Sequence, residues 1–438
     1  MSLTARQRLA LWSYQAGFHF FLPLGLLLGL PLWLFRRKRR LTILPRLGFQ
    51  RIGLTRSGPR PVWMHALSIG ETLSAVTLVR EMRQRLGERP LVFSVSTLAA
   101  KELAEERLAG RVDRIFYFPL DLVPCVAKVL GQVRPAALVV VETDIWPGLL
   151  HAVRHRGFPA FLVNGRVSPQ SFRSFRRWRT LFEPALNVFE TIFPQSEGEA
   201  ARYRAVGVQP KKIGAAGNLK FDAAAARPGA ERFQEIRREC GVAEGDRVWV
   251  AGSTHPGEEE AVLGVYRHLR SEHPGLRLIL VPRHPHRGAE VRALCEHAGF
   301  AGKLYTEDSP PTEDEVLIVD AMGRLSELYE LAEMAFVGGS LVNRGGQNPI
   351  EPAAAGKPVL FGPDMTDFPD AAAELLERDA AFQVQDREEL LERMRRLLRE
   401  PESSRRMGSR GEQWVESHRG TTARIAEHIL VRIHPNRR

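Results

Sequence analysis

The sequence predicts an α/β protein with two doubly wound domains, because two series of short apolar segments alternate with helical segments along its 438 residues. This length also exceeds the size at which a single hydrophobic core stops growing, and it suits two domains of ordinary size. A composition that is 44% hydrophobic and 26% charged is typical of a folded globular protein and excludes a disordered one.

The order of the expected elements divides the chain. The first series has expected strands at 62–66, 91–95, 114–118, 137–141, 158–163 and 191–194, with helices over 71–86 and 99–108. The second has expected strands at 247–251, 276–281, 316–319, 334–337 and 359–361. Between them, segment 221–228 contains four alanines and is the expected linker. We therefore predict domains at 41–225 and 226–438. Ligands of such sheets bind beyond the carboxyl ends of the strands, so we expect the active site in a cleft between the domains.

Residues 1–40 have the composition of a membrane anchor. No Asp, Glu, Lys or Arg occurs between Arg8 and Arg36, and five cations follow at 36–40. A bilayer-spanning helix needs about 20 apolar residues, although Pro23 and Pro31 would kink it. A cation cluster after the apolar run argues against a cleaved signal peptide and places the remaining chain on the cytoplasmic side. We expect an anchor that spans the bilayer or dips into one leaflet. A buried core helix is the alternative.

The charge balance favours an anionic partner. Lys plus Arg is 62 and Asp plus Glu is 51, so the formal net charge is +11. Nucleic acid, anionic lipid and phosphorylated substrates all fit this excess. The three cysteines are far apart, and His284 and His286 have no Cys partner or H-E-x-x-H helix. We therefore expect no metal site.

Charged residues follow the predicted strands of the first domain. Glu71 begins a helix, where it can serve as a helix cap or as a general base at the mouth of the sheet. Glu142 and Asp144 follow a buried strand directly, where carboxylates are costly unless paired or useful; Asp144 can also be a cap. Lys220 can stabilise negative charge on a leaving phosphate, although a lone lysine is usually a solvated surface residue.

Three loops of the second domain also follow predicted strands, at 281–287, 336–340 and 344–352. Glycine-rich turns let backbone N–H groups approach a phosphate, and the next helix start favours an anion. Their spacing is neither a dinucleotide fingerprint nor a Walker loop. Glu351, at such a helix start, can accept hydrogen bonds from ribose hydroxyls. In the first domain, basic and aromatic residues alternate over 173–179, which suits nucleic acid, membrane phosphates or a solvated helix face.

In combination and in this order, the motifs HALSIGE, ETDIWP, NGRVS, GNLKFD, PRHP and FVGGS followed by GGQNPIEP resemble those of 3-deoxy-D-manno-octulosonic acid (Kdo) transferases of lipopolysaccharide synthesis. The resemblance implies the GT-B fold, which has two Rossmann-like domains and a central cleft. It implies inverting transfer of Kdo from CMP-Kdo to a lipid A precursor (lipid IVA), without an active-site metal or a cofactor. It also implies the cytoplasmic face of a bacterial inner membrane, with anionic membrane lipids as partners and no nucleic acid.

The resemblance assigns roles to residues. Glu71 matches the general base, and Glu142 and Lys220 match residues that stabilise the transition state. The residues that match contacts to the CMP of the donor are Pro282, Arg283, Met322, Gly323, Arg324, Asn348, Pro349, Ile350 and Glu351. Arg324 stands where the family usually has Glu, so we expect that contact to use the backbone, and Gln347 stands where His is common. The basic segments 36–40 and 173–179 are expected to contact phosphates.

Two other functions fit the same features. One is another GT-B enzyme, using a UDP-sugar or acting as a sugar epimerase; a preference for UDP over CMP would favour it. The other is a membrane-attached nucleic-acid binder. Tight binding of RNA at physiological salt without sugar transfer would favour that function.

Overall fold

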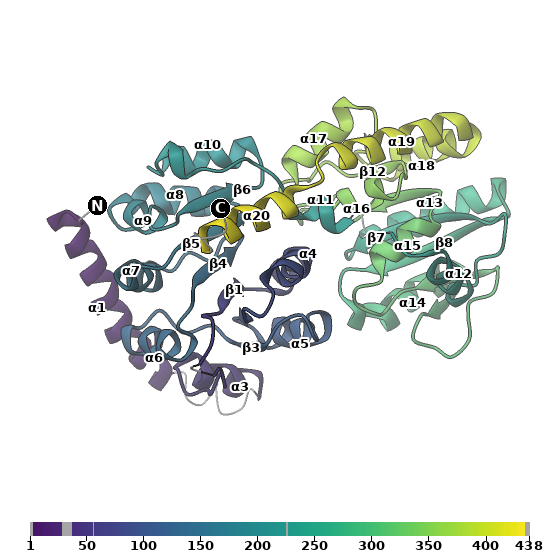
Figure 1. Cartoon of the computed structure of the whole chain (residues 1–438). Coiled ribbons are helices and arrows are strands. Elements are labelled where there is room, and N and C mark those ends of the chain that lie inside the picture. The colour runs from purple at the N-terminus through teal and green to yellow at the C-terminus, as the bar shows by residue number, and fades with distance from the viewer. Residues whose placement is uncertain (1–2, 29–36, 56, 225–226, 434–438) are drawn as a thin grey trace. The chain divides into compact units, whose positions relative to one another are not determined.

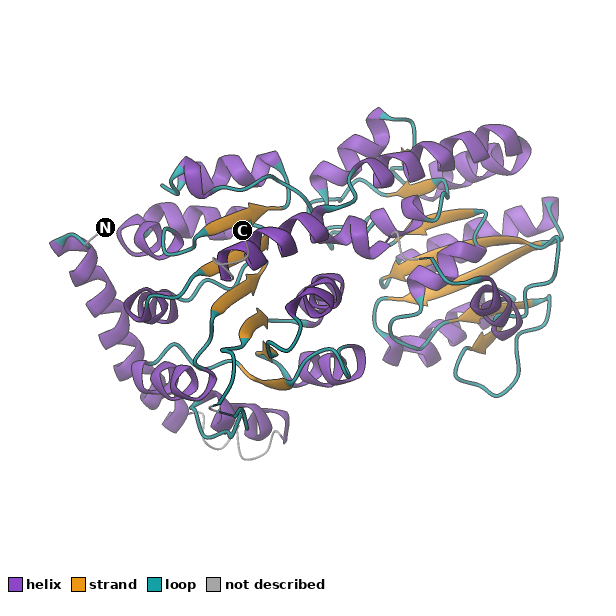
Figure 2. Cartoon of the chain, viewed as in Figure 1, coloured by secondary structure: helices purple, strands orange, loops and turns teal. Residues whose placement is uncertain are grey.

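The computed structural model describes residues 3–28, 37–55, 57–224 and 227–433, and it consists of two compact units. The first unit comprises Met1–Leu219 and Gly420–Arg438, and the second comprises Lys220–Arg419. In each unit, helices cover both faces of a sheet (Figures 1 and 2). The predicted α/β class with two Rossmann-like units is thus confirmed.

The first unit contains a six-stranded parallel sheet in the order β3-β2-β1-β4-β5-β6. Its central strands are buried along their whole length, as both-face coverage by helices requires. The strand order reverses between β1 and β4, which makes this pair the switch point where ligands of such sheets bind. The strands are β1 (Val62–Ala66), β2 (Leu91–Val95), β3 (Arg114–Tyr117), β4 (Ala137–Val141), β5 (Ala160–Gly165) and β6 (Thr191–Pro194).

The helices of the first unit bury one apolar core on each face of the sheet. They are α1 (Ala5–Leu28), α3 (Arg37–Arg46), α4 (Ile69–Leu86), α5 (Leu98–Arg107), α6 (Val123–Val133), α7 (Pro147–Arg156), α8 (Pro169–Arg177), α9 (Arg179–Leu186), α10 (Glu197–Ala205), the 3₁₀ turn η1 (Pro210–Lys212) and the C-terminal α20 (Thr421–Ile433).

The second unit contains a seven-stranded parallel sheet in the order β13-β12-β11-β7-β8-β10-β9. Its order reverses between β7 and β11, the switch point of this sheet. The strands are β7 (Arg247–Thr254), β8 (Leu276–Pro282), β9 (Ala301–Leu304), β10 (Glu315–Ile318), β11 (Met334–Val337), β12 (Val359–Phe361) and β13 (Ala381–Gln383). The helices are α11 (Leu219–Ala224), which starts at the last residue of the first unit, α12 (Ala230–Glu239), α13 (Glu258–Glu272), η2 (Pro285–Arg287), α14 (Gly288–His297), α15 (Leu325–Leu331), α16 (Ile350–Ala354), α17 (Pro369–Glu377), α18 (Arg387–Arg399) and α19 (Pro401–Ser417).

The division of the chain differs from the predicted boundaries, 41–225 and 226–438. The second unit begins at Lys220, and residues from Gly420 onward return to the first unit. The return is driven by burial, because Ile425, Ala426 and Ile429 of α20 lie in the same apolar core as residues of α4. Part of the expected linker is the short helix α11, and residues 225–226 lie outside the described residues.

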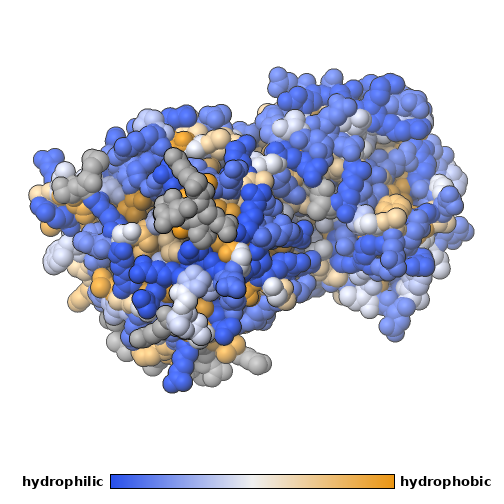
Figure 3. Space-filling model, viewed as in Figure 1, coloured by the Kyte–Doolittle hydropathy of each residue, from blue (hydrophilic) through white to orange (hydrophobic). Residues whose placement is uncertain are grey.

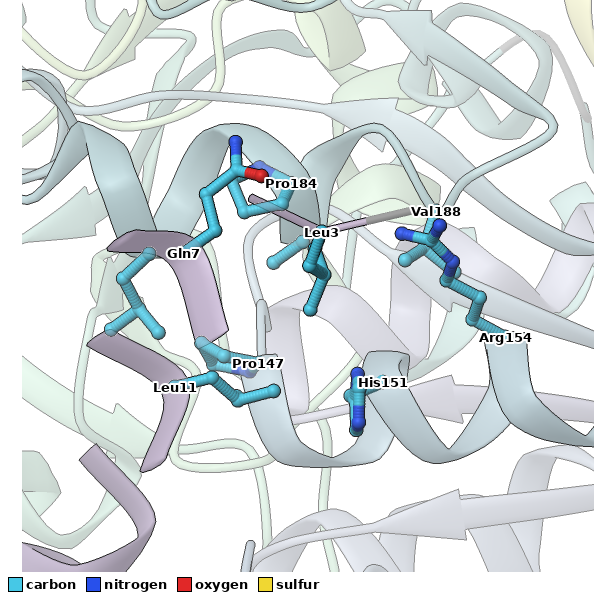
Figure 4. Close-up of a pocket in the computed structure, with 10 residues that line it drawn as sticks. Leu3, Gln7, Leu11, Pro147, His151, Arg154, Pro184 and Val188 are labelled. Carbon is cyan, nitrogen blue, oxygen red and sulfur yellow. The ribbon is translucent and has the colours of Figure 1, made fainter. Parts of the chain in front are cut away.

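The N-terminal helix α1 lies against the first unit. The hydroxyl of Tyr14 donates to Asp121 Oδ2 at 2.8 Å, and Asp121 also accepts from the backbone N–H groups of Gly148 and Leu149 at the start of α7. Figure 4 shows a pocket between the chain's N-terminal residues and helices α7 and α9, with Leu3, Gln7 and Leu11 on one side and Pro147, His151, Arg154, Pro184 and Val188 on the other.

Among the described residues, no helix combines the length and the apolar character needed to cross a membrane. The predicted anchor, residues 1–40, lies partly outside those residues, since 29–36 are not described. Large hydrophobic side chains of α1 are nonetheless exposed, namely Leu9, Trp12, Phe20 and Phe21.

Shortening a buried side chain of α20 tests whether this helix packs in the core of the first unit. Ile425→Ala should lower the free energy of unfolding by about 2–5 kcal/mol, because it leaves a cavity in the core of the first unit. Val431→Ala on the same helix should change it by no more than about 0.5 kcal/mol, because Val431 is 57% exposed. Urea denaturation measures both values. Equal effects would contradict the packing of α20 in this core.

Candidate functional site

Glu71 lies in the first turn of α4, directly after β1 at the switch point of the first sheet. Its side chain points back, and Oε2 accepts a short hydrogen bond from the backbone N–H of Leu67. Oε1 is 3.5 Å from the hydroxyl of Thr143, which is too long for a strong hydrogen bond. One carboxylate oxygen is therefore bound to the backbone before the helix, and the other remains available to a substrate.

The surroundings of Glu71 disfavour its negative charge. Burial, followed by the nearby carboxylates of Glu142 and Asp144, raises its pKa to about 8, against the lowering effect of the N–H groups of Leu67 and Ser68. Glu71 is only 5% exposed. A carboxylate with such a pKa can take up a proton near neutral pH, which is the property required of a general base.

Glu142 follows β4, the neighbour of β1, and its backbone adopts a left-handed conformation with φ 63°. Its Oε1 accepts from Ser74 Oγ at 3.1 Å and from Asn164 Nδ2 at 3.2 Å. Asn164 also has a positive φ, 56°, and its Oδ1 accepts from the backbone N–H of Leu219. Two left-handed residues other than glycine cost about 1–3 kcal/mol each and typically occur at functional sites.

Asp144 is not a helix cap, because α7 begins after Trp146. Its side chain instead pairs with a buried histidine. Its Oδ2 lies 2.6 Å from His65 Nε2, and the His65 ring stacks on Phe118. On the other side of the ring, Nδ1 is 3.0 Å from Ser94 Oγ, which accepts from Trp63 Nε1. The Trp63–Ser94–His65 chain thus fixes the position of the Asp144 carboxylate beside Glu71.

Lys220 belongs to the second unit, near the predicted donor residues. Its ammonium group lies 4.7 Å from the centre of the Phe368 ring. The charges of Lys220 and Arg283, together with a hydrogen bond from Asn348 Nδ2 at 2.9 Å, lower the pKa of Glu351, although burial is the larger effect and raises it. The structure therefore brings Lys220, Arg283, Asn348 and Glu351 together.

The other predicted donor residues lie on loops after the strands of the second sheet. Pro282 ends β8, Met322 is exposed, and Gly323 has a φ of 75°, which glycine adopts without strain. The guanidinium of Arg324 is engaged by Glu239 and Glu327 and lies over the ring of Tyr305. We still predict that the backbone of Arg324 contacts the CMP of the donor. Pro349 precedes α16, and Ile350, its first residue, is buried.

The glycine-rich loop after β11 does not offer its N–H groups to a ligand, contrary to the expectation for 336–340. Glu258 is fully buried in the first turn of α13 and accepts from the N–H groups of Gly339, Ser340 and Leu341 at 2.7–3.0 Å. The chain thus supplies its own carboxylate to a loop that could otherwise bind a phosphate. These three N–H groups are therefore not available to an external anion.

Several residues that build these sites were not predicted. His65, Ser74 and Asn164 lie beside residues that were, and Glu258 is one of three consecutive glutamates at a helix start, where solvated acids are common. Within the described residues, no group of three or more His, Cys, Asp or Glu side chains is close enough to hold a metal ion.

Comparison with known proteins identifies the family. A family model described as 3-deoxy-D-manno-octulosonic-acid transferase (kdotransferase) matches residues 42–223. The 3-deoxy-D-manno-octulosonic acid transferase of Haemophilus influenzae is 32% identical over 372 residues, which cover 84% of this chain and 86% of that protein. The chain belongs to the Kdo transferase family. Kdo transferases are glycosyltransferases of lipopolysaccharide biosynthesis, and this function of the chain, predicted from the motifs, is confirmed.

Two solved structures are similar to this Kdo transferase, one over most of the chain and one over less than half of it. The UDP-GlcNAc 2-epimerase of Neisseria meningitidis, bound to UDP-GlcNAc, covers 86% of the chain with a TM-score of 0.59 and 12% identity, and it supports the GT-B-like fold alone. The C-terminal CMP-Kdo binding domain of WaaA from Acinetobacter baumannii is 26% identical, covers 42% of this chain and 95% of its own, and has a TM-score of 0.40.

Glu258→Gln tests the internal carboxylate. The amide nitrogen of Gln cannot accept from backbone N–H groups, so buried donors lose their partner. The free energy of unfolding should fall by about 1–3 kcal/mol or more, as measured by chemical denaturation. Glu244→Gln, an exposed position of the same unit, should have no such effect. A Glu258→Gln variant as stable as the wild type would show that the loop does not depend on this charge.

Proposed function

We propose that this Kdo transferase moves Kdo from CMP-Kdo to a sugar hydroxyl of a lipid A precursor (lipid IVA), at the cytoplasmic face of a bacterial inner membrane and without a metal ion or cofactor. The observation that carries the catalytic part is the Glu71 carboxylate, buried beside two other carboxylates at the switch point of the first sheet. Family membership supports the transferred sugar, and the cations of the second unit suit an anionic nucleotide donor.

In the proposed reaction, the acceptor hydroxyl attacks the anomeric carbon of Kdo and passes its proton to Glu71. The bond between that carbon and the phosphate oxygen breaks, and CMP leaves with the electron pair. Oε1 is the oxygen suited to take the proton, because Oε2 is already bonded to the N–H of Leu67. Attack opposite the leaving group inverts the anomeric carbon.

Glu142 and Lys220 are proposed to stabilise charge in the transition state. An oxocarbenium-like sugar carries positive charge that a fixed carboxylate favours, and Ser74 and Asn164 hold Glu142 in one position. The Lys220 ammonium would act on the negative charge that develops on the departing phosphate. Arg283, Asn348 and Glu351 lie close to Lys220 and are proposed to contact the CMP part, with Glu351 suited to ribose hydroxyls.

The membrane location is proposed from the first unit. The exposed apolar side chains of α1 suit contact with a membrane surface. The hydrogen bond between Tyr14 and Asp121 holds this helix against the rest of the first unit. In Figure 3, hydrophobic residues reach an otherwise hydrophilic surface along the edge of the first unit that carries α1, at the left of the view. The basic segments 36–40 and 173–179 are proposed to bind anionic lipid headgroups or acceptor phosphates.

Product analysis tests this proposal. Incubation of the enzyme with CMP-Kdo and lipid IVA should yield lipid IVA heavier by whole Kdo units, as measured by mass spectrometry, and EDTA should leave the rate unchanged. UDP-sugars should give no product. Product formation with a UDP-sugar but not with CMP-Kdo would contradict the proposed donor. Loss of activity in EDTA, with recovery on adding a divalent cation, would contradict a reaction without a metal ion.

The pH dependence of the rate tests the base. Because Glu71 must be deprotonated to act and its pKa is raised to about 8, kcat/KM should rise with pH and level off above about 8. Glu71→Gln should lower kcat by about 10²- to 10⁴-fold. Glu88→Gln, an exposed position in the turn after the same helix, should behave as the wild type. Near wild-type transfer by Glu71→Gln would exclude Glu71 as the base.

A further inference from the structure

Four basic side chains gather at the switch point of the second sheet. His255 follows β7, Arg283 and His284 follow β8, and Arg344 lies on the loop after β11. These three strands are adjacent in the sheet, and the rings of His255 and His284 are 6.2 Å apart. The pKa of His255 is lowered, first by burial and then by the charges of His284, Arg344 and Arg283, so these groups are close enough to repel one another.

Two buried carboxylates of the same region are engaged with other groups. Glu258 accepts from backbone N–H groups, and Glu259 forms a buried ion pair with Arg287 at 2.7 Å. Across the described ranges, the guanidinium of Arg344 forms no ion pair, and Arg283 lies near Glu351 without a direct one. Two arginines without an ion pair among the described residues favour an external anion, although Glu351 and Asp364 lie nearby.

Most backbone N–H groups of the loop after β11 already have acceptors within the protein. Besides the three N–H groups held by Glu258, that of Gly345 donates to Asp364 at 2.7 Å, and those of Gly346 and Gln347 donate to backbone carbonyls of the same loop. The basic side chains are therefore the groups best suited to bind the anion.

The loops that carry these side chains are held in place before any ligand arrives. Glu258 bridges the β7 loop and the β11 loop, because it also accepts from the N–H of His255 at 2.9 Å. Ser253 adopts a left-handed conformation with φ 57°, and its carbonyl lies 3.2 Å from His255 Nδ1. Ordering costs on binding are small for such a preformed site.

We propose that Arg344 binds the carboxylate of the donor's sugar, whereas Arg283 binds the phosphate of the nucleotide. This inference rests on the proposed function. In a 2-ulosonic acid the anomeric carbon carries the carboxylate, and in the activated donor the same carbon carries the phosphate oxygen. The two anions are thus one carbon apart and fit two arginines of one cluster. A guanidinium fork binds a carboxylate through two parallel hydrogen bonds. Arg344 would thereby select acidic sugars over neutral ones.

Calorimetric titration of the full-length enzyme with CMP and with CMP-Kdo, in the absence of acceptor, tests the assignment. Arg344→Gln should weaken CMP-Kdo binding about 10- to 100-fold, the loss expected when a hydrogen bond between charged groups is removed. It should leave CMP binding unchanged, because CMP lacks the carboxylate. Arg344→Lys should recover part of the loss. Arg283→Gln should weaken both ligands.

Arg405→Gln serves as the matched control, because Arg405 is an exposed arginine of the same unit. It should change neither affinity. An Arg344→Gln variant that loses CMP and CMP-Kdo binding by the same factor would place Arg344 on the nucleotide, and one that loses neither would remove it from the site; both results overturn the inference. Failure of the wild type to bind CMP-Kdo would instead refute the proposed function.

Discussion

The proposed chemistry of the first unit depends on three carboxylates that lie close together at one end of its sheet. Glu71 lies in the first turn of α4, after β1, and Glu142 and Asp144 follow the adjacent strand β4. Burial removes much of the water that would screen the charge of Glu71. Two of them have strong partners: His65 for Asp144, and Ser74 with Asn164 for Glu142. Burial and the two neighbouring carboxylates raise the pKa of the third, Glu71, and this suits it to deprotonate a hydroxyl.

The two units have the same type of fold but opposite charges at their switch points. In the first unit, polar and basic groups behind the sheet end hold carboxylates that face the switch point. In the second unit the arrangement is reversed, since the buried carboxylates of Glu258 and Glu259 hold loops that present basic side chains. An acceptor hydroxyl needs a base and an anionic donor needs cations, so each switch point has the charge that its proposed substrate requires.

The sequence predicted most of the fold, because long buried strands separated by helices leave a clear periodic pattern. The expected strands are present, with ends shifted by at most three residues. The edge strands β9 and β13 were missed, since they are short and partly exposed and lack an apolar run. The return of α20 to the first unit was also missed, because an amphipathic helix does not encode which of two sheets it covers.

The site was predictable where a charged residue directly follows a buried strand, as Glu71 and Glu142 do. The partners were not, because the pairing of His65 with Asp144 spans 79 positions and that of Glu258 with Gly339 spans 81. The glycine-rich loop after β11 misled the prediction for the same reason, since the sequence shows the N–H groups but not the carboxylate that occupies them.

The central claim is that burial among like charges gives Glu71 its high proton affinity. A ¹³C NMR titration of side-chain carboxyl groups in glutamate-labelled enzyme, with Glu71→Gln to assign the resonance, measures that property directly. We predict that the Glu71 carboxyl titrates with a pKa of about 8. Titration near 4, the ordinary range of glutamate, would contradict the account.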